Sequence, residues 1–239
     1  MRYIPATPSD GFVIPDGPDG YPFGHPTAGP FGVPVLRGIS AYSNLDALVA
    51  FNDLGRAVNA ATSAVHFCKP DKTFQDFMRS PLNNANKYDG FGAICTPDPT
   101  ITMSMRPWQR ALRVVWARQV GATLESRGWQ VLPFLRWVTK SDYELVTAGV
   151  PTGSIIAVSI FASSKDRQLR FAFEQGMPEI VERLNPAAVL VLGRATNPVF
   201  RQLRKKTEFV PCPYPAWKPL TVKAIALQFQ SENLFDLGA

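Results

Sequence analysis

Residues 88–159 decide the fold of this chain: YDGFGAICTPDPTITMSMRPWQRALRVVWARQVGATLESRGWQVLPFLRWVTKSDYELVTAGVPTGSIIAVS. Within them, the buried apolar runs at 91–95 and 129–135 predict two strands separated by a long helix. Polar residues follow each strand at once, Thr96-Pro97-Asp98-Pro99-Thr100 after the first and Arg136-Trp137 after the second. Because ligands of α/β proteins bind at the carboxyl ends of parallel strands, these two strand ends are the predicted site.

Strands and helical patterns alternate along the rest of the chain. This alternation predicts βαβ units, a largely parallel sheet and right-handed crossover helices. About six strands are predicted, marked by His66, Phe91, Val131, Ile156, Leu190 and Phe209. A closed TIM barrel needs more strands than that. The predicted fold class is therefore α/β, as either an incomplete TIM-like barrel or an open twisted sheet.

Three helix predictions depend on local signals. Ser43-Asn44-Leu45-Asp46 has the spacing of a helix start, and the apolar residues that follow predict a helix up to Leu54. Pro107 and Gly128 mark the start and the end of the helix after the Thr-Pro-Asp turn. A third helix is predicted over 166–184, with an interruption at Gly176 and a new start at Pro178.

The chain divides by composition into three parts. Residues 1–33 form a Pro/Gly-rich arm without an apolar period, which cannot bury enough surface to fold alone. Its spaced aromatic side chains indicate that it docks, in a groove of its own domain or of a protein partner. Residues 34–230 are predicted to form a single α/β domain, and residues 231–239 an acidic-hydrophobic tail.

Composition and motifs argue against several classes of protein. With two His and three widely spaced Cys in the chain, a zinc site is not expected. The chain lacks GxGxxG, GxxxxGK[ST], HExxH and GxSxG, which disfavours an NAD site, a Walker-type nucleotide site, a zincin and an α/β-hydrolase. No cofactor and no metal ligand are assigned, and Mg²⁺ held by carboxylates and water stays open. No apolar run approaches the roughly 20 residues of a membrane span and no signal peptide is evident, so a cytoplasmic protein is predicted.

The basic residues are the candidates for contact with nucleic acid. The formal net charge of +6 suits such a polyanion. Two clusters stand out: Arg106, Arg110 and Arg113 on the predicted helix, and Arg201, Arg204, Lys205 and Lys206 after the last clear βα unit. The first three share one sector of the helix, opposite Trp108, so we expect them to form a basic stripe on its outer surface. Such a stripe is either a solvated face or a set of phosphate contacts.

The two strand ends supply the candidate ligand-binding residues. Asp98 could bind Mg²⁺, accept a proton or bind a ligand together with Thr100, or it could accept local N–H groups in an Asx-turn. Arg136 suits phosphate or carboxylate, and Trp137 offers a stacking face. Alternatively, Arg136 forms a salt bridge with Asp98 inside the fold.

Two more candidates lie on predicted strands. His66 points away from its neighbours Val65 and Phe67, as either a satisfied interior residue or a ligand-binding one. Ser159 ends the third strand of the opening stretch and has no evident base partner. Cys68 and Cys95 lie in apolar runs, where a free Cys behaves as a small hydrophobe.

A series of short motifs runs through the chain in a characteristic order: Pro34-Val35-Leu36, Val65-His66-Phe67, Asp89-Gly90-Phe91, Thr96–Thr100, Met105-Arg106-Pro107, Gly128–Pro133, Arg136-Trp137 and Gly149–Ser154. The series resembles the family called domain of unknown function 4417, over roughly residues 34–210. The resemblance implies a phage, a mobile element or a bacterial host as the source, and hence the host cytoplasm for a phage-encoded protein. It implies no particular activity.

Three functions agree with these observations. The first is a phage or mobile-element accessory protein that binds nucleic acid or a protein partner without classical catalysis. The second is an enzyme that acts on a phosphorylated ligand around Asp98 and Arg136. The third is a virion or assembly component whose arm is ordered against neighbouring subunits. We favour the first, because the basic clusters, the arm and the missing catalytic motifs all agree with it.

Overall fold

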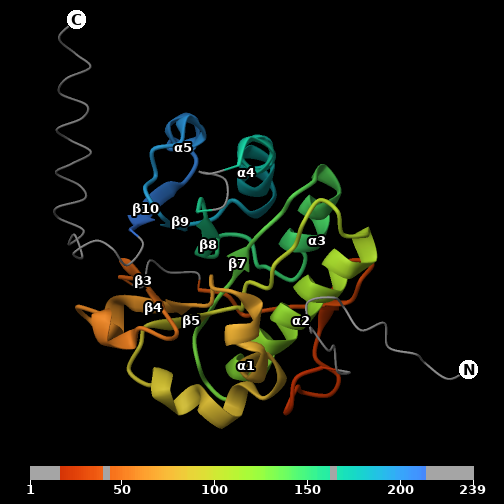
Figure 1. Ribbon diagram of the computed structural model, residues 1–239, viewed down its shortest axis with the longest axis vertical. Coiled ribbons are helices and arrows are strands. Elements are labelled where there is room, and N and C mark those ends of the chain that lie inside the picture. Colours follow the sequence, from red (N-terminus) through yellow and green to blue (C-terminus); the bar gives the residue numbers. More distant parts are fainter. Residues whose placement is uncertain (1–16, 40–43, 162–165, 214–239) are drawn as a thin grey trace, which may run out of the picture.

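The computed structural model describes residues 17–39, 44–161 and 166–213. Its strands lie in the middle of the domain with helices on both sides (Figure 1). The acidic-hydrophobic tail falls outside the described residues, as do residues 1–16 of the arm. No helix of the described part is long and apolar enough to cross a membrane.

Two four-stranded parallel sheets form the framework. The first has the order β3-β4-β5-β6 and the second the order β10-β9-β8-β7. Their bounds are β3 Ala47–Ala50, β4 Ser63–His66, β5 Ala93–Cys95, β6 Val131–Leu132, β7 Phe134–Leu135, β8 Ile156–Ser159, β9 Ala188–Leu192 and β10 Glu208–Cys212. A short antiparallel pair, β1 (Thr27–Ala28) with β2 (Val33–Pro34), precedes them. The predicted parallel α/β sheet is confirmed.

The two sheets meet at Pro133. The run at 129–135, predicted as one strand, is divided by this residue into β6 in the first sheet and β7 in the second. Proline has no N–H to donate to a ladder, so pairing is interrupted there. Its carbonyl oxygen still accepts a hydrogen bond from the Ala157 N–H at 2.8 Å, while that of Leu132 accepts from Thr96 at 2.9 Å. The chain therefore passes from one sheet to the other without a loop.

The core between the sheets consists of inward-facing strand residues. These are mostly small and apolar, and they include Ala64, Ala93, Cys95, Leu132, Phe134, Ala157, Ala188, Leu190, Leu192, Val210 and Cys212. The strands turn their alternate residues outward, as period-2 geometry requires. β3 and β10 lie close together, with Cys212 Sγ 3.9 Å from the carbonyl oxygen of Asp46, but no ladder joins these two strands in the described residues. The arrangement is a curved, unclosed sheet pair.

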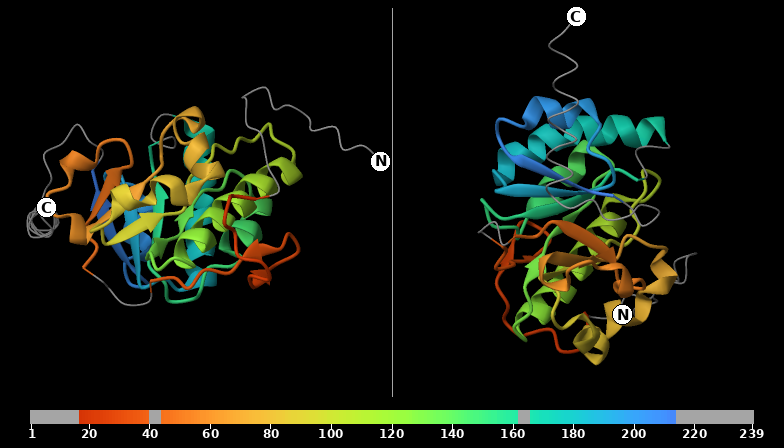
Figure 2. Two further views of the ribbon diagram at one scale, coloured as in Figure 1. Left: turned by 90° about the horizontal axis from the view of Figure 1, so that it is seen from below. Right: turned by 90° about the vertical axis from the view of Figure 1, so that its left-hand side faces the viewer.

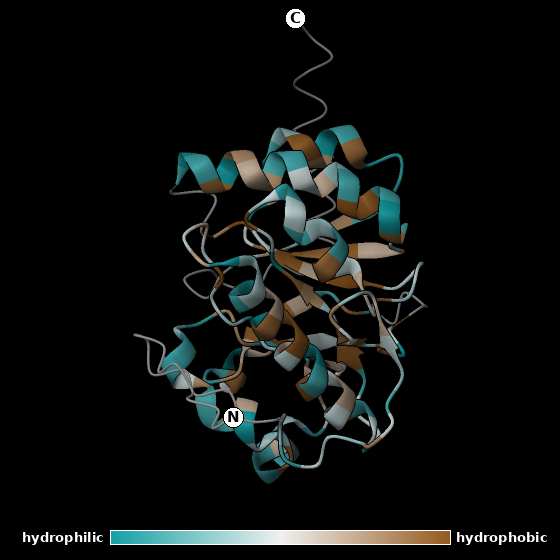
Figure 3. Ribbon diagram, turned by 90° about the vertical axis from the view of Figure 1, so that its right-hand side faces the viewer, coloured by the Kyte–Doolittle hydropathy of each residue, from teal (hydrophilic) through white to brown (hydrophobic). Residues whose placement is uncertain are grey.

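Helices cover the outward faces (Figures 2 and 3). The outer residues of the first sheet pack against α1 (Gln75–Arg79) and α2 (Pro107–Glu125). Those of the second pack against α3 (Tyr143–Thr147), α4 (Arg167–Leu184) and α5 (Pro198–Leu203). In Figure 3 the apolar colouring is concentrated on the strands and the inner sides of these helices. The sandwich of layers is the one expected for βαβ units.

The prediction of a helix between Ser43 and Leu54 is wrong. Residues 47–50 form β3, which pairs parallel to β4, and only Leu54–Arg56 form a single 3₁₀ turn. Leu48 and Val49 are both buried, although they point to opposite faces of the strand. A strand covered on both faces has a continuous apolar run, which also fits one side of a helix. The capping signal at Ser43 lies outside the described residues.

The predicted interruption of the third helix is also wrong. α4 continues through Gly176 and Pro178 as one helix from Arg167 to Leu184. Glycine is needed at 176 for packing: a Cβ added there would lie 2.1 Å from Nε1 of Trp137. The glycine therefore marks a close approach of an indole ring rather than a helix end.

The described part of the arm, residues 17–33, packs on its own domain. The Asp19 N–H donates to the carbonyl oxygen of Arg79, and Tyr21 packs against the cluster under α1 and α2. The pair β1–β2 is followed by Leu36, whose N–H donates to Gly149. A role of residues 1–16 in binding a protein partner stays a prediction.

Candidate functional site

Four side chains from four different strand ends meet at the carboxyl edge of the sheets. Asp98 follows β5, Arg136 follows β7, Ser159 ends β8 and Cys68 follows β4. Arg136 Nη2 forms an ion pair with Asp98 Oδ2 and lies 3.9 Å from Cys68 Sγ, which is 3.7 Å from Ser159 Oγ. Parallel strands bring their carboxyl ends to one edge, so residues up to 91 positions apart become neighbours.

The turn that carries Asp98 is fixed from both sides. Thr96 Oγ1 accepts hydrogen bonds from the Phe134 N–H at 2.9 Å and from Arg118 Nη1 at 3.2 Å. Pro97 and Pro99 restrict the backbone on either side of Asp98. The Asp98 side chain is only 2% exposed, and its ion pair is with Arg136. Of the two alternatives for Asp98 and Arg136, the internal salt bridge is therefore present.

Arg136 is nevertheless only partly used by this pair. Its hydrogen bonds within the described residues go through Nη2 alone, to Asp98 and Cys68. The guanidinium group has donors on all three nitrogens, so those of Nε and Nη1 remain available. The side chain is 27% exposed, in contrast to the buried Asp98. Arg136 can therefore hold Asp98 and a ligand at the same time.

Burial and neighbouring charges set the protonation of the titratable groups of the site. Burial raises the pKa of the Cys68 thiol to about 11, and the neighbouring Asp98 charge adds to this, so the thiol stays protonated at neutral pH. Burial also raises the pKa of Asp98, an effect that the charge of Arg136 opposes. Ser159 Oγ accepts a hydrogen bond from the Phe161 N–H at 3.1 Å and, among the described residues, otherwise contacts the neutral thiol. No nucleophile–base pair of covalent catalysis is formed at the site by the part of the chain that the structure describes.

His66 supports the site from inside the core. Its Nδ1 accepts a hydrogen bond from the Cys68 N–H at 3.1 Å, which places the ring proton of the neutral form on Nε2. Burial, and secondarily the charge of Lys69, lowers the pKa of His66 to about 3. The imidazole is thus neutral at physiological pH and positions the backbone of Cys68. It is an interior histidine.

Thr100 is tied to an ion pair next to the site. Its N–H and its hydroxyl both donate to Asp71 Oδ1, at 3.0 and 2.8 Å. Asp71 also pairs with Arg113, whose Nη1 lies 2.8 Å from Asp71 Oδ2. Asp71 thereby joins the loops after β4 and β5 to helix α2. Thr100 thus positions the loop, and its contact with a ligand stays a prediction.

The prediction of an exposed basic stripe on α2 is wrong. Arg110 and Arg113 are buried, and Arg110 Nε pairs with the buried Asp142 at 2.7 Å. Trp108, placed on the buried side by the helical period, is instead 58% exposed. The reason is long-range: the loops after the strands place Asp71 and Asp142 against this side of the helix. Of the three arginines, Arg106 alone is exposed.

Trp137 does not offer a stacking face to a ligand, contrary to prediction. It is buried and stacks on Phe173, with the ring centroids 5.3 Å apart, and its Nε1 donates to the carbonyl oxygen of Ala172 at 3.0 Å. Alternation along the chain after β7 sends Trp137 toward α4 while Arg136 reaches the strand-end site. Trp137 therefore belongs to the core under α4.

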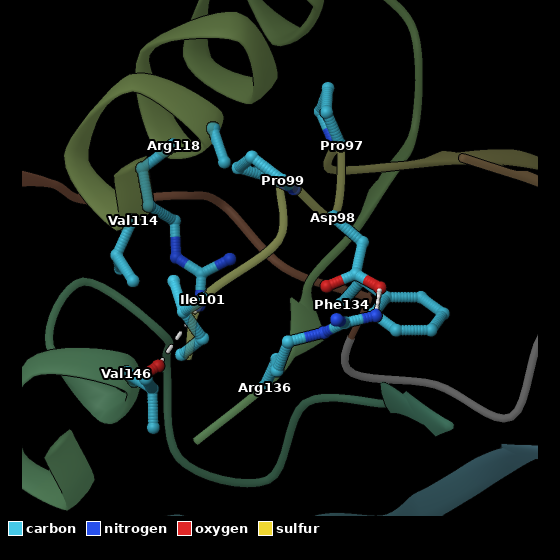
Figure 4. A pocket seen from close by; sticks show the side chains of 10 residues that line it. Pro97, Asp98, Pro99, Ile101, Val114, Arg118, Phe134, Arg136 and Val146 are labelled. Carbon is cyan, nitrogen blue, oxygen red and sulfur yellow. Dashed lines mark hydrogen bonds and ion pairs between the residues drawn. The ribbon is translucent and has the colours of Figure 1, made fainter. Parts of the chain in front are cut away.

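Sequence reasoning missed Arg118, which lies beside the site. This arginine of α2 is 2% exposed and donates from Nη2 to the carbonyl oxygen of Val146 at 2.9 Å. Asp98, Arg118 and Arg136 line one small cavity of about 20 Å³ (Figure 4). An arginine between the buried Ala117 and Val120 is the signal that could have revealed it, because a lone charge on an apolar helix face needs a partner.

The second basic cluster is exposed, as a nucleic-acid contact would require. Arg201, Arg204, Lys205 and Lys206 all face solvent. They lie on α5 and in the turn before β10. Because β10 begins there, this cluster is at the amino edge of the sheet, opposite Asp98 and Arg136. One of its charges, that of Lys206, pairs with Glu182.

No group of three or more His, Cys, Asp or Glu side chains is placed to hold a metal ion in the part of the chain that the structure describes. Asp98 is the carboxylate at the centre of the site, and its charge is engaged by Arg136.

Fold and site together define an α/β protein of parallel strands with a cationic, partly buried site at the strand ends. The chain belongs to the family described as domain of unknown function (DUF4417), which matches residues 25–210. It is similar to the Gene 1 protein of Mycobacterium phage D29, with 29% identity over 149 residues, 62% of this chain and 55% of the relative. It is also similar to the Gene 1 protein of Mycobacterium phage L5, with 30% identity over 134 residues, 55% of this chain and 57% of the relative. The chain thus spans little more than half of these relatives, and no solved structure matches it significantly.

Proposed function

We propose that this chain is a phage accessory protein that binds a phosphorylated ligand at the carboxyl edge of its sheets, through Arg136. The observation that carries the proposal is the unused part of the Arg136 guanidinium. Nη1 lies at the end of the planar guanidinium, and its N–H groups can donate to a phosphate oxygen. Asp98 holds Nη2 and thereby orients the guanidinium.

The same site argues for binding without covalent catalysis. The Cys68 thiol is protonated, His66 is neutral and turned toward the Cys68 backbone, and no base contacts Ser159 among the described residues. A site that only binds needs a preorganised cation and an accessible face, and Arg136 has both. The similarity to two phage proteins supports a phage context for this activity.

The test is isothermal titration calorimetry with inorganic phosphate and adenosine 5′-monophosphate, and with adenosine as the phosphate-free control. We expect millimolar or tighter binding of the two phosphates, and at least a tenfold loss in Arg136→Gln, about 1.4 kcal/mol. Arg127→Gln is the matched control, because Arg127 is an exposed arginine outside the site. Equal affinities of both variants, or no heat with either phosphate, would disprove the proposal.

A second candidate function rests on a different observation. The four cations at the amino edge all lie on the protein surface, in contrast to the buried arginines of α2. Such a surface suits phosphate contacts along a nucleic acid. We propose it as an additional, sequence-independent contact.

Fluorescence anisotropy with a labelled duplex measures this contact. The logarithm of the affinity should fall linearly with the logarithm of the salt concentration. The triple variant Arg201→Gln, Arg204→Gln, Lys205→Gln should bind about tenfold more weakly than Arg127→Gln and have a shallower slope. Absence of duplex binding at low salt removes this candidate and leaves the first one untouched.

A further inference from the structure

Arg118 is a buried cation that has no carboxylate partner within the described part of the chain. Its side chain donates to a hydroxyl and a carbonyl, Thr96 Oγ1 and the oxygen of Val146. Its Nε has no hydrogen-bond partner among the described residues, and no ion pair with Arg118 occurs there either. Burial lowers the pKa of Arg118 to about 10 and no neighbouring charge opposes this effect. An unpaired buried charge is costly, so a protein that keeps one has a use for it.

The unpaired charge lies against the proposed ligand site. Figure 4 shows the guanidinium of Arg118 on one side of the cavity and the Asp98–Arg136 pair on the other. The cavity volume of about 20 Å³ accommodates a single water-sized atom or group. Two cations and one carboxylate line it, so the local charge is positive by one.

We infer that the ligand of this site is a phosphomonoester whose terminal phosphate places one oxygen in the cavity between Arg118 and Arg136. This inference rests on the proposed function and assigns Arg118 as its second cation. The oxygen in the cavity would face Arg118, while the remaining phosphate oxygens face the free donors of Arg136 outside it.

The number of oxygens and the charge select the ligand class. A phosphomonoester has three terminal oxygens, so one can enter the cavity while another accepts from Arg136 Nη1. A phosphodiester, such as an internal phosphate of nucleic acid, has only two terminal oxygens and a substituent on each side. A carboxylate also has two, in one plane. Of the three, the monoester alone carries up to two negative charges, one for each cation.

The inference also predicts an unusual stability effect. Because Arg118 lacks a counter-charge without ligand, replacing it with an apolar residue of similar length should stabilise the free protein. A purely structural Arg118, valued for its hydrogen bonds to Thr96 and Val146, would have the opposite effect. The melting temperature of Arg118→Met therefore separates the two roles before any ligand is added.

The experiment compares methyl phosphate with dimethyl phosphate by calorimetry on the full chain. We expect the wild type to prefer the monoester at least tenfold, Arg118→Lys to retain most of this preference, and Arg118→Met to lose it while melting at a higher temperature. A lower melting temperature together with an unchanged preference would overturn the inference.

A cavity-filling variant keeps the test decisive even where Arg118→Met does not fold. Val114 lines the cavity, whereas Val115, also partly buried on α2, does not. Val114→Ile should abolish the monoester preference without removing a charge, and Val115→Ile should keep it. Equal preference in these two variants overturns the inference.

The outcomes also separate this inference from the proposed function. Binding of both esters that depends on Arg136 but is unaffected by Val114→Ile refutes the inference alone. Binding of neither ester refutes both. Adenosine 5′-monophosphate and a 5′-phosphorylated oligonucleotide then distinguish a free nucleotide from a nucleic-acid end, since both carry the terminal phosphate.

Discussion

Helix α2 has two regions of buried arginine that differ in how their charge is compensated. In its first turns, Arg110 and Arg113 each pair with a carboxylate, Asp142 and Asp71. Two turns later Arg118 is equally buried and has only neutral acceptors in the described residues. The first region fixes the loops around the site, and the second faces the cavity of the site itself. The structural arginines each have a carboxylate partner. Arg118, which we expect to contact a ligand, has none among the described residues.

The largest loss of stability is expected when a buried arginine of the first region loses its carboxylate partner. Asp142→Ala leaves Arg110 as an unpaired buried charge and also removes the acceptor of the Val138 and Thr139 N–H groups. We expect a loss of about 3–5 kcal/mol in the free energy of unfolding, measured in urea. Glu179→Ala at the exposed pair with Arg183 is the control and should change the stability by less than about 1 kcal/mol. Similar values for the two variants would contradict the assignment.

The second effect is a pH dependence that arises from the core beneath the site. The pKa of His66 is about 3 in the folded protein, below its ordinary value of 6.5, so the unfolded chain binds the proton first as pH falls. The neutral His66 therefore contributes fully to stability above pH 6.5, and this contribution decreases toward pH 3. The free energy of unfolding should fall by about 3 kcal/mol between pH 6.5 and 4.

Urea titrations at several pH values measure this dependence. His66→Asn cannot titrate in that range, so its stability should vary less with pH than that of the wild type. A variant with the same slope as the wild type would show that other groups are responsible.

A smaller effect is expected from the ion pair that holds Thr100. Asp71→Asn keeps an acceptor for the Thr100 N–H but removes the charge that faces Arg113. Hydrogen bonds to charged groups contribute about 1.5–3 kcal/mol, so we expect a loss of about 2 kcal/mol in unfolding free energy. Asp53→Asn, at the exposed pair with Arg56, should have little effect. A loss in the second variant as large as in the first would argue against a special role of Asp71.

The smallest effect is expected at Trp108. The side chain is largely exposed on the surface of α2, so Trp108→Gln should change the stability by less than about 0.5 kcal/mol. Thermal unfolding measures it. A large destabilisation would show that Trp108 is buried and the arginines face outward, as the helical period predicts. The contrast between paired and unpaired buried arginines on α2 would then be wrong.

Much of the fold could be predicted from local patterns. The strands around His66, Ile94, Ile156 and Leu190 were recognisable because strands buried on both faces are continuous apolar runs bounded by turn residues. β3 was not, because a short buried run at the edge of a sheet has the same composition as one side of a helix. The division of 129–135 at Pro133 also depends on which neighbour each half pairs with, and that neighbour is distant in the sequence.

The site was predicted in position and only partly in content. Asp98, Arg136 and Ser159 were named because each follows or ends a strand, and the structure brings them to one edge. The sequence indicates a hydrophobic role for Cys68 and gives no prediction for Arg118. The role of Arg118 depends on a cavity formed by the loop after β5 together with β7, α2 and α3.

The sequence by itself determined the parallel α/β class, the edge at which polar residues gather, and membership of a phage-associated family. These properties follow from local periodicity and from short motifs in order. Only the tertiary structure decided which arginines are compensated, because a charge finds its partner through space. Asp71 and Asp142 come from loops 42 and 32 residues away from Arg113 and Arg110, and no such carboxylate reaches Arg118 in the described residues. Which arginine pairs with a carboxylate depends on distant parts of the chain, and local sequence patterns do not encode it. This pairing distinguishes the arginines that support the site from the one that lines it.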